Sequence, residues 1–350
     1  DPASKVPWAT WDEAGYVNTP AAQQLASEAA SQSIVLLKNV ARTLPLKAVG
    51  AATRKAMTVA VIGRNANATS NMQGNYFGTA PFLISPIAGI SKHAKTVYSD
   101  GVDTEAAAKL VAEADAVVLV VGLLSDCSLE GKRAPGAACA LGKSDEAEGH
   151  DRTSLLLPGN QDALIADVAS AASKKKIPVA LVVMSGGQLD ISEHEANPHV
   201  GAIVWCGYPG QSGGAAIADI LFGHTNPSGS LTLTWYKEEF TQQVKATDMG
   251  MRPDKTTGNP GRSYRFFTGE PLYRFGHGLS FTAFEHTLRT VGSATVESSA
   301  IEAAGRPLPA DRVAGMTLSL SMLSKTTVLS LECNTTNVGD YDGAKPILIF

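Results

Sequence analysis

The chain has 350 residues, of which 44% are hydrophobic and 18% are charged. This composition allows a packed core of domain size and excludes a disordered chain. The formal net charge is −4, without a lysine and arginine block that would track phosphates, so we expect no nucleic-acid partner. We also expect no membrane partner, because no apolar run is long enough to cross a bilayer.

The two ends of the sequence read as cut points. Residues 1–16 contain no apolar stretch of the kind found in a secretory signal peptide. Residues 346–350 form an apolar, strand-like run that stops without a turn. We therefore expect the chain to be a fragment of a longer protein.

The first elements expected are a helix and a short strand. Thr19 caps the helix, Pro20 occupies its first position, and an alanine-rich body continues to about Ser31. The apolar run at 34–37 then predicts a strand.

A repeated alternation of strand and helix patterns follows. Runs that are apolar throughout lie at 58–62, 116–121, 179–184 and 202–206, and amphipathic patterns lie near 104–114, 160–172 and 214–221. Such an alternation predicts an α/β fold with a mostly parallel sheet sandwiched by helices. Ligands of these sheets bind beyond the carboxyl ends of the strands. The loops that begin at Gly63, Gly122, Ser185 and Gly207 should therefore lie at one edge.

The last third of the chain has a different texture. Residues 231–235 alternate between apolar and polar, which predicts an edge strand, and a polar stretch rich in Gly and Pro follows. After Phe281 only strand patterns occur, at 317–323 and 328–333, before a turn at 339–343. This pattern predicts the start of a β-sandwich, that is, a partial all-β domain.

The loop after strand 116–121 is the richest in chemical groups. It contains Asp126, Glu130, Asp145, Glu146, Glu148, His150, Asp151 and Arg152. Carboxylates crowded together disfavour one another's charge, which keeps one of them protonated, as a general acid requires. The alternative is a solvated acidic loop. The loop has a single imidazole and its spacing matches no ligand motif, so we expect no metal.

Two glycine-containing motifs allow other readings. Residues 210–214 have the form G-x-S-x-G around Ser212, which permits a serine hydrolase as an alternative. Residues 207–209 separate this serine from its strand, so the preferred reading is a helix that packs closely on the sheet. Residues 63–67 lack the further glycines of a dinucleotide fingerprint, so we expect no cofactor.

Cysteines and glycosylation motifs bear on the compartment. The chain has four cysteines, too few for a disulfide scaffold, although Cys127 and Cys139 flank a loop and are candidates for a bridge in an oxidising compartment. The sequons at Asn67 and Asn334 agree with secretion. We therefore expect a secreted, extracellular glycoprotein.

Motifs in a fixed order cover nearly the whole chain. They include Glu146-Ala147-Glu148 with Asp151-Arg152, and the stretches 34–39, 44–46, 61–67, 74–78, 157–161, 205–214, 233–236, 247–253, 260–266 and 275–281. Taken together, the sequence resembles glycoside hydrolase family 3, in the branch of plant and fungal β-xylosidases and arabinofuranosidases.

The resemblance implies an architecture of barrel, α/β sandwich and fibronectin III-like domain. On this reading residues 1–20 are a linker from a missing barrel, 21–237 the sandwich, 238–280 a linker, and 281–350 a partial fibronectin III-like domain. The family's nucleophilic aspartate lies on the barrel and is therefore expected to be absent here.

The resemblance also implies a catalytic residue on the sandwich. Glu146 falls on the first glutamate of the branch's E-A-E…D-R pattern, with Glu148 as its neighbour. About twenty residues are inserted before that motif, an unusual loop length. Glu130 lies in the insertion in an L-E-G context that other branches use, so it is a rival. Glu146 is preferred because the register of Asp151 and Arg152 also matches.

The function that the resemblance implies is exo-acting, retaining hydrolysis of β-linked xylo-oligosaccharides, most like a β-D-xylosidase of xylan breakdown. Glu146 is expected to protonate the leaving oxygen and later to activate water. Without the barrel, the chain alone is expected to be inactive. A non-catalytic carbohydrate-binding or structural remnant remains the alternative.

Overall fold

The computed structural model describes residues 2, 5–11, 13–47, 56–75, 77–125, 145–147, 151–293 and 329–347. The chain divides into two compact units. Unit 1 comprises Asp1–Phe281 with Tyr341–Phe350, and unit 2 comprises Thr282–Asp340. Within the described residues, no helix is both apolar enough and long enough to cross a bilayer.

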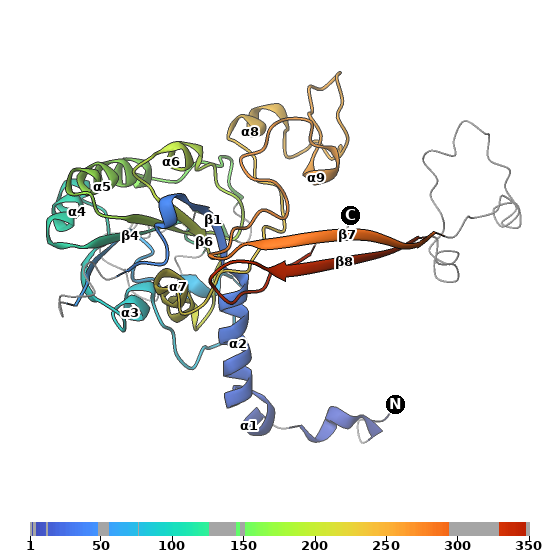
Figure 1. Ribbon diagram of the computed structural model, residues 1–350, viewed down its shortest axis with the longest axis horizontal. Helices are drawn as coiled ribbons and strands as arrows, with labels where there is room; N and C mark the ends of the chain where they lie inside the picture. Colours follow the sequence, from blue (N-terminus) through green and yellow to red (C-terminus); the bar gives the residue numbers. More distant parts are fainter. Residues whose placement is uncertain are drawn as a thin grey trace, which may run out of the picture. The chain divides into compact units, whose positions relative to one another are not determined.

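Unit 1 is built on a sheet whose described strands follow the order β1-β6-β5-β4-β2-β3 (Figure 1). The strands are β1 (Val35–Asn39), β2 (Thr58–Ile62), β3 (Lys95–Ser99), β4 (Ala116–Gly122), β5 (Val179–Met184) and β6 (Ala202–Trp205). Strands β3, β2, β4, β5 and β6 are parallel to their neighbours, and β1 runs antiparallel to β6. The prediction of a mostly parallel sheet is therefore confirmed.

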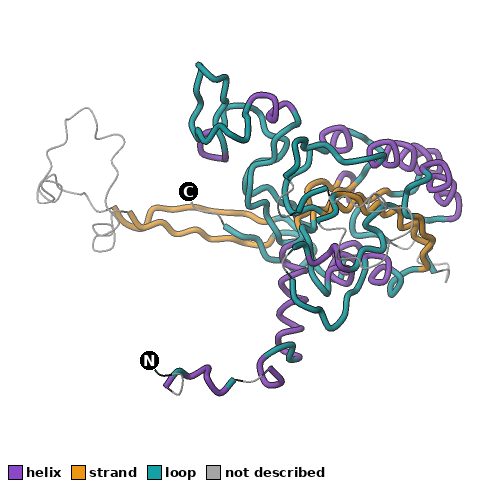
Figure 2. The backbone as a smooth tube through the Cα atoms, turned by 180° about the vertical axis from the view of Figure 1, so that it is seen from behind, coloured by secondary structure: helices purple, strands orange, loops and turns teal. Residues whose placement is uncertain are grey.

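Helices lie on both faces of this sheet (Figure 2). The described helices of unit 1 are α1 (Glu13–Tyr16), α2 (Pro20–Ser33), α3 (Pro86–Ile90), α4 (Thr104–Leu110), α5 (Gln161–Lys175), α6 (Ser192–Ala196), α7 (Gly213–Phe222), α8 (Glu239–Gln243) and α9 (Ser263–Phe266). Of these, α3 and α7 cover one face of the sheet and α4 and α5 cover the other, whereas α1, α8 and α9 lie away from it (Figure 1). Short 3-10 turns occur at Pro7–Thr10, Val40–Arg42, Ser70–Gln73 and Val111–Glu113. The expected cap of α2 is present, since the Thr19 hydroxyl accepts a hydrogen bond from the Ala22 amide at 3.2 Å.

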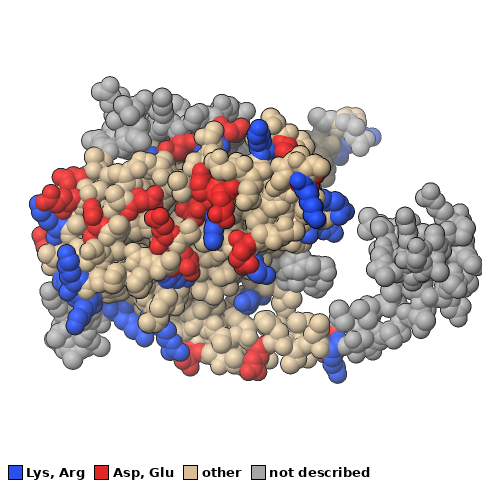
Figure 3. Space-filling view, turned by 90° about the horizontal axis from the view of Figure 1, so that it is seen from above, with Lys and Arg blue, Asp and Glu red and all other residues tan. Residues whose placement is uncertain are grey.

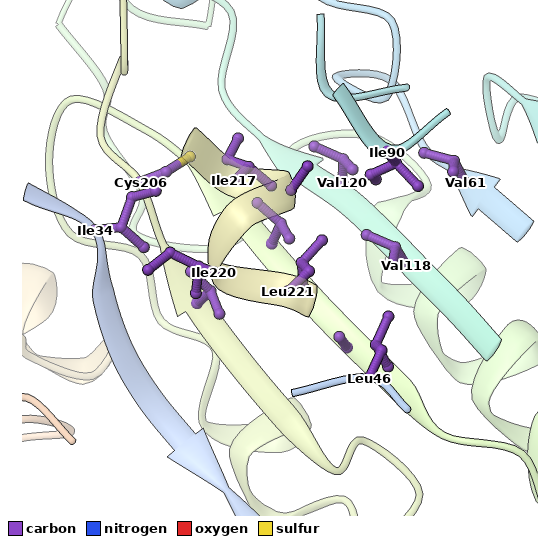
Figure 4. Packing of buried hydrophobic residues seen from close by; sticks show 14 of the residues in the cluster. Ile34, Leu46, Val61, Ile90, Val118, Val120, Cys206, Ile217, Ile220 and Leu221 are labelled. Atoms are coloured by element: carbon purple, nitrogen blue, oxygen red, sulfur yellow. The ribbon is translucent and has the colours of Figure 1, made fainter. Parts of the chain in front are cut away.

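Two apolar clusters form the core, one on each face of the sheet. Alternate residues of β4 belong to different clusters: Val118 and Val120 pack with α3 and α7, whereas Val117 and Leu119 pack with α4 and α5. Figure 4 shows the first cluster, in which α7 lies directly over the strands. Every residue of β4 is buried, and each buried aliphatic side chain stabilises the fold by roughly 1.5–3 kcal/mol. This explains why the strand pattern of β4 is apolar throughout.

Two local expectations differ from the structure. Residues 231–235 do not form a strand; Trp235 makes only an isolated bridge to Tyr273. Leu231 and Trp235 are both buried, and their backbone groups bond to residues 276–277 and 272–273 at two separate points, which do not make a continuous ladder. Strand β3 was not expected, because it lies at the sheet edge and is half exposed, which weakens its apolar pattern.

The segment after residue 238 returns to the sheet of unit 1. The Leu279 amide donates to the Leu36 carbonyl at 2.8 Å, and His277 Nε2 lies 2.9 Å from the Leu37 carbonyl oxygen. Leu36 also forms an isolated antiparallel bridge with Leu279. Residues 277–279 thus cover the edge strand of the sheet.

Unit 2 contains a two-stranded antiparallel ladder in its described part. Strand β7 (Phe284–Ser293) pairs with β8 (Leu329–Asn337). The strand expected at 317–323 lies outside the described residues, as does Val328, the first residue of the strand expected at 328–333. The fibronectin III-like assignment stays a prediction, as do the domain boundaries given above.

Candidate functional site at the carboxyl ends of the parallel strands

The loops that follow β2, β4, β5 and β6 meet at one edge of the sheet, as expected. The Asn65 amide, just after β2, donates to the Val120 carbonyl of β4 at 3.2 Å. Gly122 ends β4 with a φ of +124°, and a Cβ there would stand 2.0 Å from the Met184 carbonyl oxygen of β5. Only glycine combines that backbone conformation with that close approach. The strands can therefore turn sharply at this edge.

Glu146 returns to this edge although an insertion separates it from β4. The amides of Asp145 and Glu146 donate to the Leu124 carbonyl at 3.0 and 3.3 Å. Asp145 Oδ2 in turn accepts from the Leu124 amide at 2.8 Å. These hydrogen bonds close the base of the loop, so Glu146 lies beside the carboxyl end of β4 whatever the length of the insertion.

The Glu146 carboxylate is surrounded by hydrogen-bond donors from three separate segments. Its Oε1 accepts from the Tyr208 hydroxyl at 2.6 Å and from the Gly186 amide at 3.2 Å. Its Oε2 accepts from Arg152 Nε at 3.0 Å. The side chain is 22% exposed, so it is largely removed from water but remains reachable.

Arg152 is itself held in place. Its Nη2 donates to the Gln188 carbonyl at 3.1 Å, and its side chain is 17% exposed. Gln188 follows β5 and its Oε1 accepts from the Tyr236 amide at 2.6 Å. The guanidinium that faces Glu146 is thus tied to the β5 loop and, through Gln188, to the segment after α7.

Tyr208 follows β6 and lies against two glycines. A Cβ on Gly74 would stand 3.2 Å from the Tyr208 ring, and a Cβ on Gly186 would stand 3.0 Å from it and 3.1 Å from Glu146 Oε1. Burial, and then the hydrogen bond to Glu146 and its charge, hold the pKa of Tyr208 well above its ordinary range. The hydroxyl therefore keeps its proton and stays a donor.

A buried polar network supports the site from beneath. Asn71 Nδ2 donates to the Leu123 carbonyl at 3.0 Å and to Asn65 Oδ1 at 3.1 Å. Asn71 Oδ1 accepts from the Ser125 amide at 2.9 Å. Because these partners are satisfied inside the protein, the loops after β2 and β4 are fixed to each other.

A second ion pair lies beside Glu146. Arg64 Nη1 lies 3.0 Å from Asp145 Oδ2, with side-chain exposures of 9% and 13%. Burial lowers the pKa of Arg64, while the charge of Asp145 and its hydrogen bond oppose that change. Figure 3 shows a face on which Asp and Glu side chains are interspersed with Lys and Arg among the described residues.

The structure places the other candidates as follows. Asp126, Glu130, Glu148 and His150 lie outside the described residues, as do Cys127 and Cys139. Asp151 is exposed. Ser212 is buried at the start of α7, and no histidine among the described residues is hydrogen-bonded to it. Within the same residues, no group of His, Cys, Asp and Glu has the geometry of a metal site.

Sequence reasoning identified Glu146 and Arg152 as a motif but missed the role of Tyr208. The available signal was an aromatic residue with a hydroxyl group, three positions after the end of β6 and on the edge where the loops were expected to meet. Its partner lies 62 positions away in the sequence, so no local pattern connects the two.

Comparison with known proteins shows the family to which the chain belongs. The family model described as the glycosyl hydrolase family 3 C-terminal domain matches residues 34–281. The chain is 45% identical over 280 residues to "Beta-xylosidase/alpha-L-arabinofuranosidase 2" of Medicago sativa subsp. varia, covering 78% of the chain and 33% of that protein. It is 41% identical over 349 residues to "Beta-D-xylosidase 1" of Arabidopsis thaliana, covering 95% and 41%.

A solved structure gives the same result. A GH3 exo-β-xylosidase in complex with a xylobiose aziridine activity-based probe matches with a TM-score of 0.67 and 37% identity, covering 81% of this chain and 34% of the other. The chain thus spans between a third and about two-fifths of the length of these relatives.

Proposed function

Because the chain belongs to glycosyl hydrolase family 3 and carries its C-terminal domain, we propose that it is the part of a secreted, retaining, exo-acting β-D-xylosidase that supplies the general acid/base, Glu146. The observation that carries this proposal is the position of the Glu146 carboxylate at the carboxyl edge of the sheet. It is largely desolvated, held by Tyr208, Gly186 and Arg152, and still reachable.

The proposed chemistry needs a second carboxylate from elsewhere. In a retaining glycosidase the nucleophile and the acid/base stand roughly 5 Å apart across the sugar. Residue by residue, the resemblance gives this chain the acid/base and assigns the nucleophile to a barrel domain. We propose that a xylo-oligosaccharide binds between the two, and that this chain alone has no activity. Turnover of an aryl xyloside by the isolated chain would contradict that.

The relatives support the choice of substrate. The two plant proteins are named as β-xylosidases, and the solved relative is in complex with a xylobiose probe. The sequons at Asn67 and Asn334, both exposed, are compatible with a secreted glycoprotein. We propose secretion on that basis.

The test is Glu146→Ala, together with Glu146→Gln, in the full-length polypeptide that contains this chain. We expect kcat to fall by about 10²- to 10⁴-fold, the usual contribution of a general acid/base. Added azide should restore turnover of an activated aryl xyloside by Glu146→Ala, because an anionic nucleophile needs no base. The product should be the β-xylosyl azide.

Glu105→Gln is the matched control, because Glu105 is an exposed carboxylate that pairs with Lys109 on α4. Its rate should be unchanged. An unchanged rate in both Glu146 variants, without an azide effect, would favour the non-catalytic remnant and leave Glu148 or Glu130 as candidates.

A further inference from the structure

We propose that Tyr208 is a positioning residue that holds Glu146 by its Oε1 atom, so that Oε2 is the oxygen that carries the transferred proton. This inference rests on the proposed function, since it takes Glu146 as the acid/base. It adds Tyr208, from the loop after β6, to the residues that support catalysis. It also gives the two carboxylate oxygens different roles, since Oε1 is anchored and Oε2 transfers the proton.

The division follows from counting lone pairs. A carboxylate oxygen can accept two hydrogen bonds in its plane. Oε1 already accepts two, from the Tyr208 hydroxyl at 2.6 Å and the Gly186 amide at 3.2 Å. Among the described residues, Oε2 accepts from Arg152 Nε at 3.0 Å and from no other group. The proton can therefore be placed on Oε2 without breaking a hydrogen bond.

Tyr208 is suited to hold the carboxylate because its own position is fixed. The ring packs against the apolar cluster beneath α7, and its edges lie against Gly74 and Gly186. The 2.6 Å contact to Oε1 is the shortest of the three at Glu146. Since burial keeps the Tyr208 hydroxyl protonated, this donor is present whether Glu146 is charged or neutral.

The two half-reactions can then be written with Oε2. In the first, the Oε2–H bond breaks and its proton goes to the glycosidic oxygen. That oxygen keeps the electron pair of the broken bond to C1, while the nucleophilic carboxylate bonds to C1. In the second, Oε2 takes a proton from the water whose oxygen bonds to C1, and the nucleophile leaves with its electron pair. Tyr208 exchanges no proton in either step.

The decisive experiment uses Tyr208→Phe in the full-length polypeptide with two substrates. Xylobiose has a poor leaving group that needs the proton, whereas 2,4-dinitrophenyl β-xyloside departs without it. We expect kcat/KM for xylobiose to fall about 10- to 100-fold, the scale of a misplaced catalytic group. For the dinitrophenyl substrate we expect less than about a 3-fold change, because its cleavage does not use the acid.

Tyr98→Phe is the matched control. Tyr98 lies on the edge strand β3 and is 45% exposed, so both substrates should react at the original rates. An equal loss on both substrates in Tyr208→Phe would mean that Tyr208 only supports the fold, and no loss on either would mean that Oε1 needs no anchor. Either result overturns the inference.

A second variant moves the carboxylate without removing the hydroxyl. Gly186→Ala places a Cβ 3.0 Å from the Tyr208 ring and 3.1 Å from Oε1, tighter than most Cβ contacts, so the ring or the carboxylate must shift by a few tenths of an ångström. The same selective loss on xylobiose is expected. Gly78→Ala is its control, because a Cβ there would meet nothing within 4 Å.

The Glu146 variants keep this inference separate from the proposed function. If Glu146→Ala is impaired and rescued by azide while Tyr208→Phe is not selective, only the role of Tyr208 is lost. If Glu146→Ala is unimpaired, the proposed function fails first and the role of Tyr208 fails with it.

Discussion

The two ends of the same parallel strands are built in different ways. At the amino ends, single side chains satisfy the backbone: Lys175 Nζ donates to the carbonyls of Val111, Ala112 and Ala114 at 3.2, 2.7 and 2.5 Å. At the carboxyl ends, side chains also bind one another, since Glu146 accepts from both Tyr208 and Arg152. The amino ends therefore close the fold, while the carboxyl ends organise groups that can react.

The strongest test of this difference between the two ends is a substitution at a carboxyl end, where the backbones of β4 and β5 approach closely. Gly122→Ala combines a φ of +124° with a Cβ 2.0 Å from the Met184 carbonyl oxygen. We expect the free energy of unfolding to fall by about 3 kcal/mol or more, because backbone must move. Urea denaturation of the chain measures this.

Gly201→Ala is the amino-end counterpart. Its Cβ would meet the Thr43 side chain, 2.2 Å from Oγ1 and 3.0 Å from Cβ, but none of its three nearest atoms is backbone of a neighbouring strand. Thr43 is partly exposed, so the loop that carries it can shift. A loss of about 1 kcal/mol is expected, in keeping with ordinary point substitutions. Equal losses at the two glycines would remove the distinction between the ends.

The next effect tests the polar network under the site. Asn71→Ala leaves the Ser125 amide without its buried partner and leaves the Leu123 carbonyl with only the 3.3 Å hydrogen bond from Asn65 Nδ2. We expect unfolding to become easier by about 2 kcal/mol, the cost of unsatisfied buried groups. Asn160→Ala, which also removes hydrogen bonds to carbonyls but at an exposed position, should cost about 0.5 kcal/mol. Thermal unfolding compares the two variants.

The smallest effect is expected at the amino ends. Lys175→Met removes a cation from the carbonyls that precede β4, and we expect a loss of about 1 kcal/mol that shrinks in high salt. Lys174→Met, at the exposed neighbouring position, is the control and should be neutral. Chemical denaturation at low and high salt separates them. A loss that does not change with salt would point to packing of the lysine stem instead.

The strands that are buried on both sides could be predicted from sequence, since their apolar runs reflect burial directly. Strands β2 and β5 have the expected bounds, and β4 and β6 differ by a single residue at the carboxyl end. Edge elements were less predictable: β3 was missed, and residues 231–235 were wrongly expected to form a strand. An edge element is only partly buried, so its apolar pattern is weak, and its conformation depends on partners distant in the sequence.

The candidate site was also predictable only in part. The expectation that the loops share one edge followed from the parallel topology and is confirmed. The assignment of Glu146 as the acid/base came from the resemblance and stays a prediction, while its environment needed coordinates. Gly186 and Gln188 come from the loop after β5 and Tyr208 from the loop after β6, both distant from Glu146 in the chain, and their convergence is a property of the folded sheet.

The contact of residues 277–279 with β1 has a consequence for solubility. An uncovered edge strand presents a row of free amides and carbonyls to which a second polypeptide can add as a further strand. Here Leu279 and His277 occupy that row at Leu36 and Leu37. The motif 275–281 thus occupies hydrogen-bonding positions on β1 to which a strand of a second molecule would otherwise bind. We therefore expect the need to cover this edge to restrict which residues can occupy the motif.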